Sequence, residues 1–230
     1  MNRSAGVPPA MAMQQGERDD SVPDHKFWHS RGYLPHCDAP GLLQAITFRL
    51  ADSLPADVLE RLQQDVDDDA QRRTSIENLL DAGHGACWLK QPAIADIVRN
   101  ALLHWDGQRY RLLAWCVMPN HVHVLIETRA GSPLPDILHS WKSFTAKAIN
   151  RHLGRTGTVW MPDYFDRYIR DDPHLAAVIA YIHGNPVKAG LVQKEQDWPH
   201  SSASLERTGA RASCSPQKEI SGRDARVPAK

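Results

Sequence analysis

The stretch "WCVMPNHVHVLIE", residues 115–127, places two histidines one residue apart in an otherwise apolar segment. Alternating apolar residues are typical of a β-strand, in which successive side chains point to opposite faces of the sheet. His121 and His123 therefore share one face, about 6 to 7 Å apart along the strand. Two imidazole nitrogens at this spacing can converge on one metal ion, with bonds of roughly 2.0 to 2.1 Å.

A second stretch, "DDPHLAAVIAYIHGNP" at residues 171–186, predicts an amphipathic helix. Asp172 can cap its start, and Gly184 with Pro186 predicts its end. At about 100° per residue, three polar side chains fall on one edge of the apolar stripe. They are His174, Tyr181 and Asn185.

Together these groups suggest chemistry on a phosphodiester. Two histidines leave metal positions open, and an amide oxygen such as that of Asn185 can be a third ligand. A tyrosine hydroxyl, with an ordinary pKa of about 10, becomes an effective nucleophile when a divalent ion stabilises the phosphoryl charge. Attack by Tyr181 would leave a covalent phosphotyrosine and release a 3′-OH. Rejoining would need no nucleotide, and the sequence contains no GxxxxGK[ST] phosphate-binding loop.

These residues must be positioned by a small set of elements. Strands are expected over residues 42–50, 110–118, 121–127 and 158–170. Helices are expected over residues 55–66, 74–82, 91–105, 134–153 and 171–186. The order through residue 170 is βαββαβ, which predicts an α+β fold with a ferredoxin-like antiparallel sheet and helices on one face.

The 230 residues are enough for one sizeable core. We expect a single domain over residues 25–206, with disordered polar tails over 1–24 and 207–230. The sequence has neither an apolar run of membrane-spanning length nor the apolar region of a signal peptide, which predicts a cytoplasmic protein. The four cysteines have no CxxC spacing and are expected to be reduced thiols.

Charge is balanced overall, with 27 basic and 27 acidic residues, which by itself argues against a nucleic-acid partner. The distribution is polarised, however, because residues 52–69 are acidic and residues 139–194 are basic. Such a run is usually a solvated face, but it also allows phosphate contacts. The candidate nucleic-acid contacts are Lys142, Lys147, Arg151, Lys188 and His174.

At these residues the sequence resembles the REP-associated tyrosine transposases, which are single-tyrosine HUH endonucleases. The resemblance spans residues 26–204 and is carried by several motifs. They are "HSRGYLPH", "TFRLADSLP", "VMPNHVHVLIE", "VWMPDYFDRYIRD", "YIHGNPVKAGLV" and "DWPHSS". An HxH pair alone is a weak signal, whereas an HxH strand followed by the "YIxxNPVKAGLV" pattern is specific.

The resemblance implies a HUH-type fold and a role for each site residue. His121 and His123 would bind Mg²⁺ or Mn²⁺, Asn185 would be the third ligand, and Tyr181 would form a 5′-phosphotyrosine. The implied substrate is single-stranded DNA beside a palindromic hairpin repeat, cut and rejoined by a monomer or a homodimer. Such a protein would act in the cytoplasm at the nucleoid.

Other interpretations stay open at this point. The histidines could be ordinary strand residues bonded to neighbours, Tyr181 an aromatic residue at the edge of the core, and His174 a surface residue. Asn185 could form a turn, because a residue before proline is disfavoured in the α region. As a whole, the chain could be a zinc hydrolase with a water nucleophile, or a non-catalytic single-stranded nucleic-acid-binding module of ferredoxin-like fold.

Overall fold

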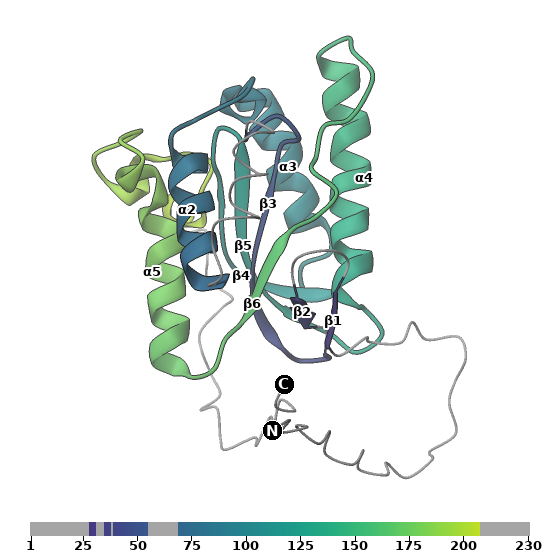
Figure 1. The fold of residues 1–230 in the computed structure, drawn as a ribbon, viewed down its shortest axis with the longest axis vertical. Helices are drawn as coiled ribbons and strands as arrows, with labels where there is room; N and C mark the ends of the chain where they lie inside the picture. Colours follow the sequence, from purple (N-terminus) through teal and green to yellow (C-terminus); the bar gives the residue numbers. More distant parts are fainter. Residues whose placement is uncertain (1–27, 31–34, 38, 55–68, 208–230) are drawn as a thin grey trace, which may run out of the picture.

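The computed structural model describes residues 28–30, 35–37, 39–54 and 69–207 (Figure 1). The tails expected over 1–24 and 207–230 and the helix expected over 55–66 lie outside the described residues, except that Arg207 is the last residue of a described helix.

A four-stranded antiparallel sheet forms the centre of the described fold, with the strand order β4-β5-β3-β6. Its strands are β3 (Leu43–Arg49), β4 (Tyr110–Val117), β5 (His121–Thr128) and β6 (Phe165–Tyr168). Both β3 and β4 run antiparallel to the β5 strand between them, which is the split arrangement of ferredoxin-like folds. The predicted α+β class and sheet are confirmed. A separate hairpin joins β1 (Trp28–Ser30) to β2 (Pro35–Cys37).

Five α-helices and two short 3₁₀ helices accompany the described strands. They are α2 (Asp69–Asp81), η1 (Trp88–Lys90), α3 (Pro92–His104), α4 (Leu134–His152), α5 (Asp172–Lys188), η2 (Glu195–Asp197) and α6 (Ser202–Arg207). Within this described part, no helix has both the length and the apolar character needed to cross a bilayer. Strand β6 is shorter than expected, since Pro162 has no N–H to donate and Trp160 forms only an isolated bridge to Leu50.

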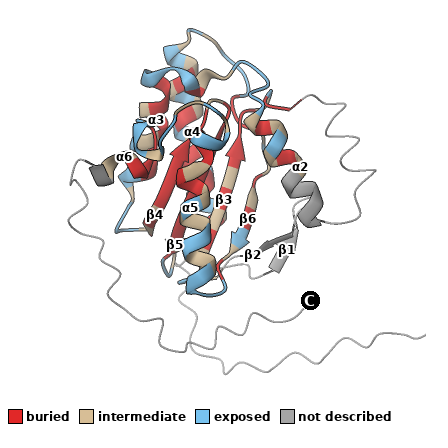
Figure 2. Cartoon of the chain, turned by 90° about the vertical axis from the view of Figure 1, so that its left-hand side faces the viewer, coloured by how far each residue is buried: buried red, intermediate tan, exposed pale blue. Residues whose placement is uncertain are grey.

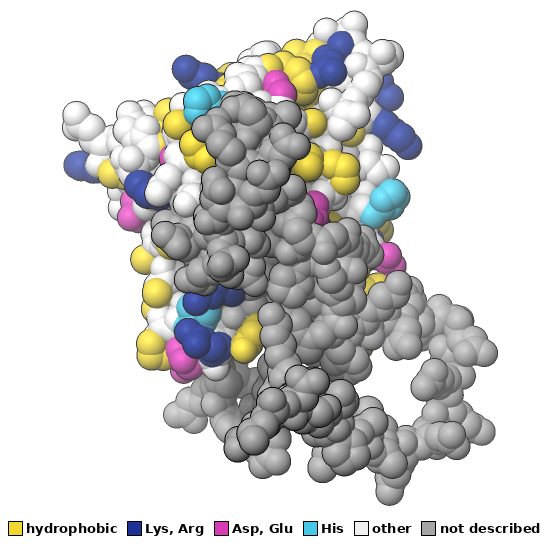
Figure 3. Space-filling view, viewed as in Figure 1, with side chains coloured by type: hydrophobic (Ala, Val, Ile, Leu, Met, Phe, Trp, Pro, Cys, Tyr) yellow, Lys and Arg dark blue, Asp and Glu magenta, His cyan; other side chains and the backbone are white. Residues whose placement is uncertain are grey.

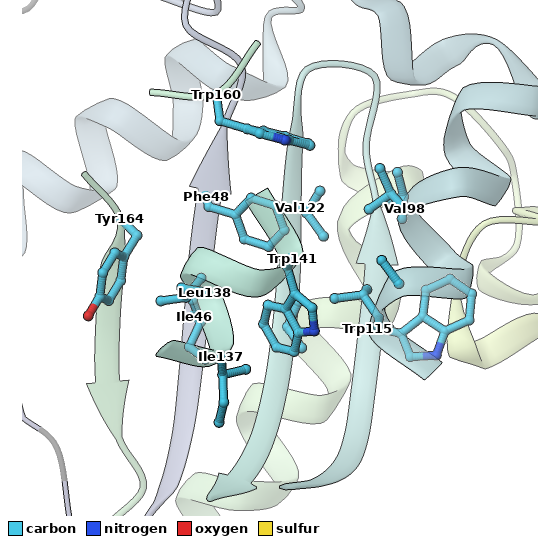
Figure 4. Close-up of a cluster of buried hydrophobic side chains, with 14 of the residues drawn as sticks. Ile46, Phe48, Val98, Trp115, Val122, Ile137, Leu138, Trp141, Trp160 and Tyr164 are labelled. Atoms are coloured by element: carbon cyan, nitrogen blue, oxygen red, sulfur yellow. The ribbon is translucent and has the colours of Figure 1, made fainter. Parts of the chain in front are cut away.

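The larger core lies between one face of the sheet and helices α3 and α4. Figure 4 shows Trp141 of α4 beside Phe48 and Ile46 of β3, with Trp160 packed on the Phe48 ring. Burial of such aromatic side chains contributes much of the stabilisation of a domain of this size. Trp115, Trp141 and Trp160 are all buried in this core.

Helix α5 covers the other face of the sheet, over β4 and β5 (Figure 2). Its Ile182 packs with Ala114, Cys116 and Leu125. The prediction that helices cover only one face is therefore wrong. The physical reason is that β4 and β5 carry apolar side chains on both faces, so both must be removed from water.

Candidate metal and tyrosine site

The two histidines lie side by side on β5, on the face that α5 covers. Val122 and Val124 point into the opposite core, so the predicted alternation is confirmed. The register of the sheet pairs His121 with Arg49 and His123 with Thr47. Both imidazoles are buried, with exposures of 1% and 3%.

The imidazole nitrogens converge, with His121 Nε2 and His123 Nε2 3.0 Å apart. Asn120 Nδ2 donates to the carbonyl of His84 at 3.0 Å, which turns Asn120 Oδ1 towards His121 Nδ1 at 2.8 Å. Because an amide oxygen only accepts, His121 carries its proton on Nδ1 and presents the lone pair of Nε2 to its neighbour. Thr47 Oγ1 lies 2.9 Å from His123 Nδ1 and orients that ring in the same way.

Burial keeps both imidazoles neutral. It lowers the pKa of His121 well below the ordinary value, and the nearby His123 and Lys188 lower it further. Burial and Lys188 lower the pKa of His123 to about 3. A neutral imidazole is the form that binds a metal ion, so neither residue has to lose a proton first at neutral pH.

Helix α5 brings Tyr181 to the histidines. The Tyr181 and His123 rings meet edge to face, with centroids 5.5 Å apart. The side chains of Glu77 and Asn185 lie within hydrogen-bonding reach of the Tyr181 hydroxyl. Burial raises the pKa of Tyr181 well above its ordinary value, the carboxylates of Glu77 and Asp81 raise it further, and the Asn185 amide beside it acts in the opposite direction.

Asn185 lies one turn further along α5 and is almost fully buried. Its Nδ2 donates to the Tyr181 carbonyl at 3.2 Å, while Oδ1 has no partner within the described part of the chain. The expected end of the helix at Gly184 and Pro186 and the turn interpretation of Asn185 are both wrong, because α5 continues to Lys188. The N–H of Ala189 donates to the carbonyl of Asn185 at 2.9 Å, so the helical backbone hydrogen bonds resume beyond the proline.

The start of α5 also differs from the prediction, since the side chain that caps the helix is that of Asp171 rather than Asp172.

Two carboxylates of α2, those of Asp81 and Glu77, also lie at the site. The sequence did not indicate either of them as a site residue. Asp81 Oδ1 lies 4.0 Å from His121 Nε2, and its Oδ2 forms an ion pair with Lys188 Nζ at 2.8 Å. Glu77 lies beside Tyr181, and its own pKa is raised, chiefly by burial. The spacing of four residues places Glu77 and Asp81 on one helix face, but no local pattern indicates that this face meets the histidines.

The predicted nucleic-acid contacts do not gather at one place. Lys188 lies at the site, with its ammonium 6.0 Å from the centre of the Tyr181 ring. His174 lies two turns before Tyr181, about 10 Å away along the helix axis, and accepts a hydrogen bond from the Arg170 N–H. His174 was expected on the same edge of the helix, but the helical rise separates it from the site.

The remaining predicted contacts belong to α4, on the opposite side of the sheet from α5. Lys142 Nζ donates to the carbonyls of Met161, Pro162 and Asp163. Its ammonium group therefore fixes the backbone segment that precedes β6. Lys147 and Arg151 are exposed towards the end of α4, where Figure 3 shows several Lys and Arg side chains at the upper right. Their contact with nucleic acid stays a prediction.

The donor set fits a divalent cation. Two neutral imidazole nitrogens face each other, and the buried Asn185 oxygen has no other partner among the described residues. Over the same residues, no three His, Cys, Asp or Glu side chains already converge as a finished site. The two described cysteines whose side chains are placed, Cys87 and Cys116, are free thiols, as expected. A pair of histidines with an amide oxygen leaves positions open for a phosphate oxygen.

The chain is similar to known proteins over the segment that holds these residues. Residues 91–185 match the family model described as "Transposase IS200 like", and this segment includes both histidines, Tyr181 and Asn185. A REP-associated tyrosine transposase of Escherichia coli (strain K12) is 28% identical over 106 residues, which are 46% of this chain and 62% of that protein. A Haemophilus influenzae protein assigned to the same class is 31% identical over 109 residues, which are 40% of this chain and 58% of that protein. The chain thus spans about three fifths of the length of the curated relatives it matches.

One solved structure is also similar, that of a REP-associated tyrosine transposase bound to a REP hairpin. It is 19% identical, with a TM-score of 0.49, and the match covers 81% of this chain and 93% of that one.

Proposed function

Since this chain resembles the REP-associated tyrosine transposases, we propose that it is a metal-dependent single-stranded DNA endonuclease and strand transferase. It cleaves beside palindromic hairpin repeats through a covalent 5′-phosphotyrosine on Tyr181. The observation that carries the proposal is the contact between Tyr181 and the histidine pair. Its ring lies 5.5 Å from that of His123, and its side chain packs against the same face of the sheet.

The chemistry is a transesterification in two steps. The Tyr181 oxygen forms a bond to phosphorus, the bond from phosphorus to the 3′ oxygen breaks, and the phenol proton is balanced by the proton that the released 3′-OH gains. The reverse attack by another 3′-OH restores a phosphodiester and frees the tyrosine. The number of phosphoester bonds is conserved in each step, so the reaction needs no external energy source.

Each residue of the site has a separate role in the proposed reaction. His121, His123 and Asn185 would hold Mg²⁺ or Mn²⁺, which when bound stabilises negative charge on the phosphoryl group and the leaving oxygen. The Asn120 oxygen, which accepts from His121, and the Thr47 hydroxyl, which bonds His123, fix the orientation of the two rings. Burial against the sheet holds Tyr181 near them.

The substrate and setting follow from the resemblance. Relatives named for their association with REP sequences favour a hairpin repeat as the target, with the cut in adjoining single-stranded DNA. We place this activity in the cytoplasm at the nucleoid, with a monomer or a homodimer as the active form. The basic side chains of α4 and the Lys188 ammonium would contact phosphates of the DNA.

The two alternative functions fit the site less well. A single-stranded nucleic-acid-binding module of this fold stacks bases on an open sheet face, whereas helices cover both faces of the described sheet. A zinc hydrolase with a water nucleophile gives no role to Tyr181, whose ring lies 5.5 Å from that of His123.

The test is to trap the covalent adduct. Single-stranded DNA with a hairpin, labelled at its 3′ end, is incubated with the protein and Mn²⁺, because a 5′-phosphotyrosine retains the label on the protein. The native chain and a Tyr168→Phe control, altered on β6, are expected to form the labelled adduct, and Tyr181→Phe is expected to form none. An equal adduct yield from Tyr181→Phe would refute the proposal.

A further inference from the structure

Asp81 places a negative charge next to the histidine pair. It is the last residue of α2, and its side chain is only 11% exposed. Oδ1 lies 4.0 Å from His121 Nε2, while Oδ2 pairs with Lys188 at 2.8 Å. The carboxylate is thus fixed by a cation on one oxygen, and its other oxygen is the one near the imidazole.

The chemistry of the expected cation calls for such a group. Mg²⁺ and Mn²⁺ favour anionic oxygen ligands, and Mg²⁺ in proteins is usually bound through one or two carboxylates. Two imidazoles and the amide of Asn185 carry no negative charge, a donor set that suits zinc, nickel or copper better. Among the described residues, Asp81 places a carboxylate oxygen 4.0 Å from an imidazole nitrogen of the pair.

The distances are consistent with ligation of one ion. Ligands about 2.1 Å from an octahedral ion are about 3.0 Å apart when adjacent and about 4.2 Å apart when opposite. The two Nε2 atoms are 3.0 Å apart, and Asp81 Oδ1 is 4.0 Å from His121 Nε2. The first matches the separation of adjacent ligands, and the second is close to that of opposite ligands. The described His, Cys, Asp and Glu side chains do not yet meet on one point, so ligation would require the Asp81 carboxylate to move towards the pair.

We propose that Asp81 is a further ligand of the divalent cation, with Lys188 as the residue that orients its carboxylate. The inference rests on the proposed function, in which His121, His123 and Asn185 hold that cation. It extends the site to a fourth residue, from a helix that lies 40 residues before the histidines in the sequence. Carboxylates that bind metals are typically held by such an outer partner.

Calorimetric titration of the full chain with Mn²⁺ tests this inference without measuring activity. Asp81→Asn keeps the shape and removes the charge, and its affinity is expected to fall about 10- to 100-fold. The matched control is Asp136→Asn, because this exposed aspartate of α4 lies away from the site. The control is expected to bind like the native chain. If Asp81→Asn binds as tightly as Asp136→Asn, the inference is overturned.

His121→Ala separates this failure from that of the proposed function. If His121→Ala loses Mn²⁺ binding and Asp81→Asn keeps it, the result supports the histidine metal site and rejects only the role of Asp81 as a ligand. If the native chain itself binds no Mn²⁺, the metal site and the inference fall together.

A spectroscopic measurement on the native chain does not depend on a variant that folds. Protein with carbon-13 in its aspartate carboxylates is loaded with Mn²⁺ and studied by electron–nuclear double resonance. Ligation by Asp81 predicts a carbon-13 coupling of the strength found for a bound carboxylate. Absence of that coupling overturns the inference.

Discussion

One residue at the site has a polar atom that the rest of the described chain leaves unpaired. Asn185 Oδ1 is buried without a hydrogen-bond partner among the described residues. Such an atom costs about 1–3 kcal/mol of stability, and most buried polar atoms in proteins are paired. Its position one turn from Tyr181, beside two facing imidazoles, indicates that this place is shaped for a ligand rather than for stability.

The pKa of Tyr181 depends on its acidic neighbours as well as on burial. Glu77→Gln removes a carboxylate whose charge disfavours the phenolate, so the pKa of Tyr181 is expected to fall. The measurement is an ultraviolet difference titration of tyrosinate, in which each protein is compared with its own Tyr181→Phe variant. Glu127→Gln is the control, because Glu127 pairs with Arg111 at the other end of β5. An unchanged titration in Glu77→Gln would contradict this account.

At the scale of elements, buried polar contacts join the helices to the sheet. Tyr110 of β4 donates from its hydroxyl to the Leu102 carbonyl of α3 at 2.7 Å. The same oxygen accepts from Trp141 Nε1 of α4 at 2.9 Å. One side chain thus connects three elements of the larger core. Burial raises the pKa of Tyr110 to about 12.

Tyr110→Phe is expected to lower the free energy of unfolding at neutral pH by about 1–3 kcal/mol, because it leaves the Trp141 N–H and the Leu102 carbonyl without their partner. The difference from the native chain should shrink between about pH 10 and about pH 12. In that window the unfolded native chain loses the phenol proton and the folded chain keeps it, so native stability falls as pH rises. Tyr110→Phe lacks this dependence. Urea unfolding of both proteins at neutral pH and at about pH 11 measures the effect, and a constant difference would show that the pKa of Tyr110 is not raised.

At the scale of the whole molecule, the site joins segments that are distant in the sequence. The end of α2, the start of β5 and the last turns of α5 meet around the histidines. A cation that binds there binds only the folded chain, because the unfolded chain does not bring these segments together. Binding should therefore stabilise the fold as a whole.

Mn²⁺ is expected to raise the thermal unfolding midpoint of the native chain. At about 100 times the dissociation constant, the gain is about 2.7 kcal/mol. His123→Ala should show no such shift relative to its own metal-free midpoint. His200→Ala is the control, since His200 is also buried but lies outside β5, and its carbonyl accepts from the Val117 N–H of β4. An equal shift in His123→Ala would place the cation elsewhere.

The sequence by itself determined those features that depend on local periodicity. Alternation along β5 places His121 and His123 on one face, and helical spacing places Tyr181 one turn from Asn185. The order of strands and helices also predicts the ferredoxin-like sheet. These patterns repeat every two or every 3.6 residues, so they can be read within a single segment.

Only the tertiary structure decided which segments meet at the site. It brings Asp81 and Glu77 of α2 beside the histidines and Tyr181, lays α5 over the second face of the sheet, and turns Lys142 away to the opposite side. It also carries α5 past Pro186, where packing of the last turns outweighs the preference of a residue before proline. Contacts between distant segments depend on how the whole chain packs, and that information is spread over many residues rather than present in any one motif.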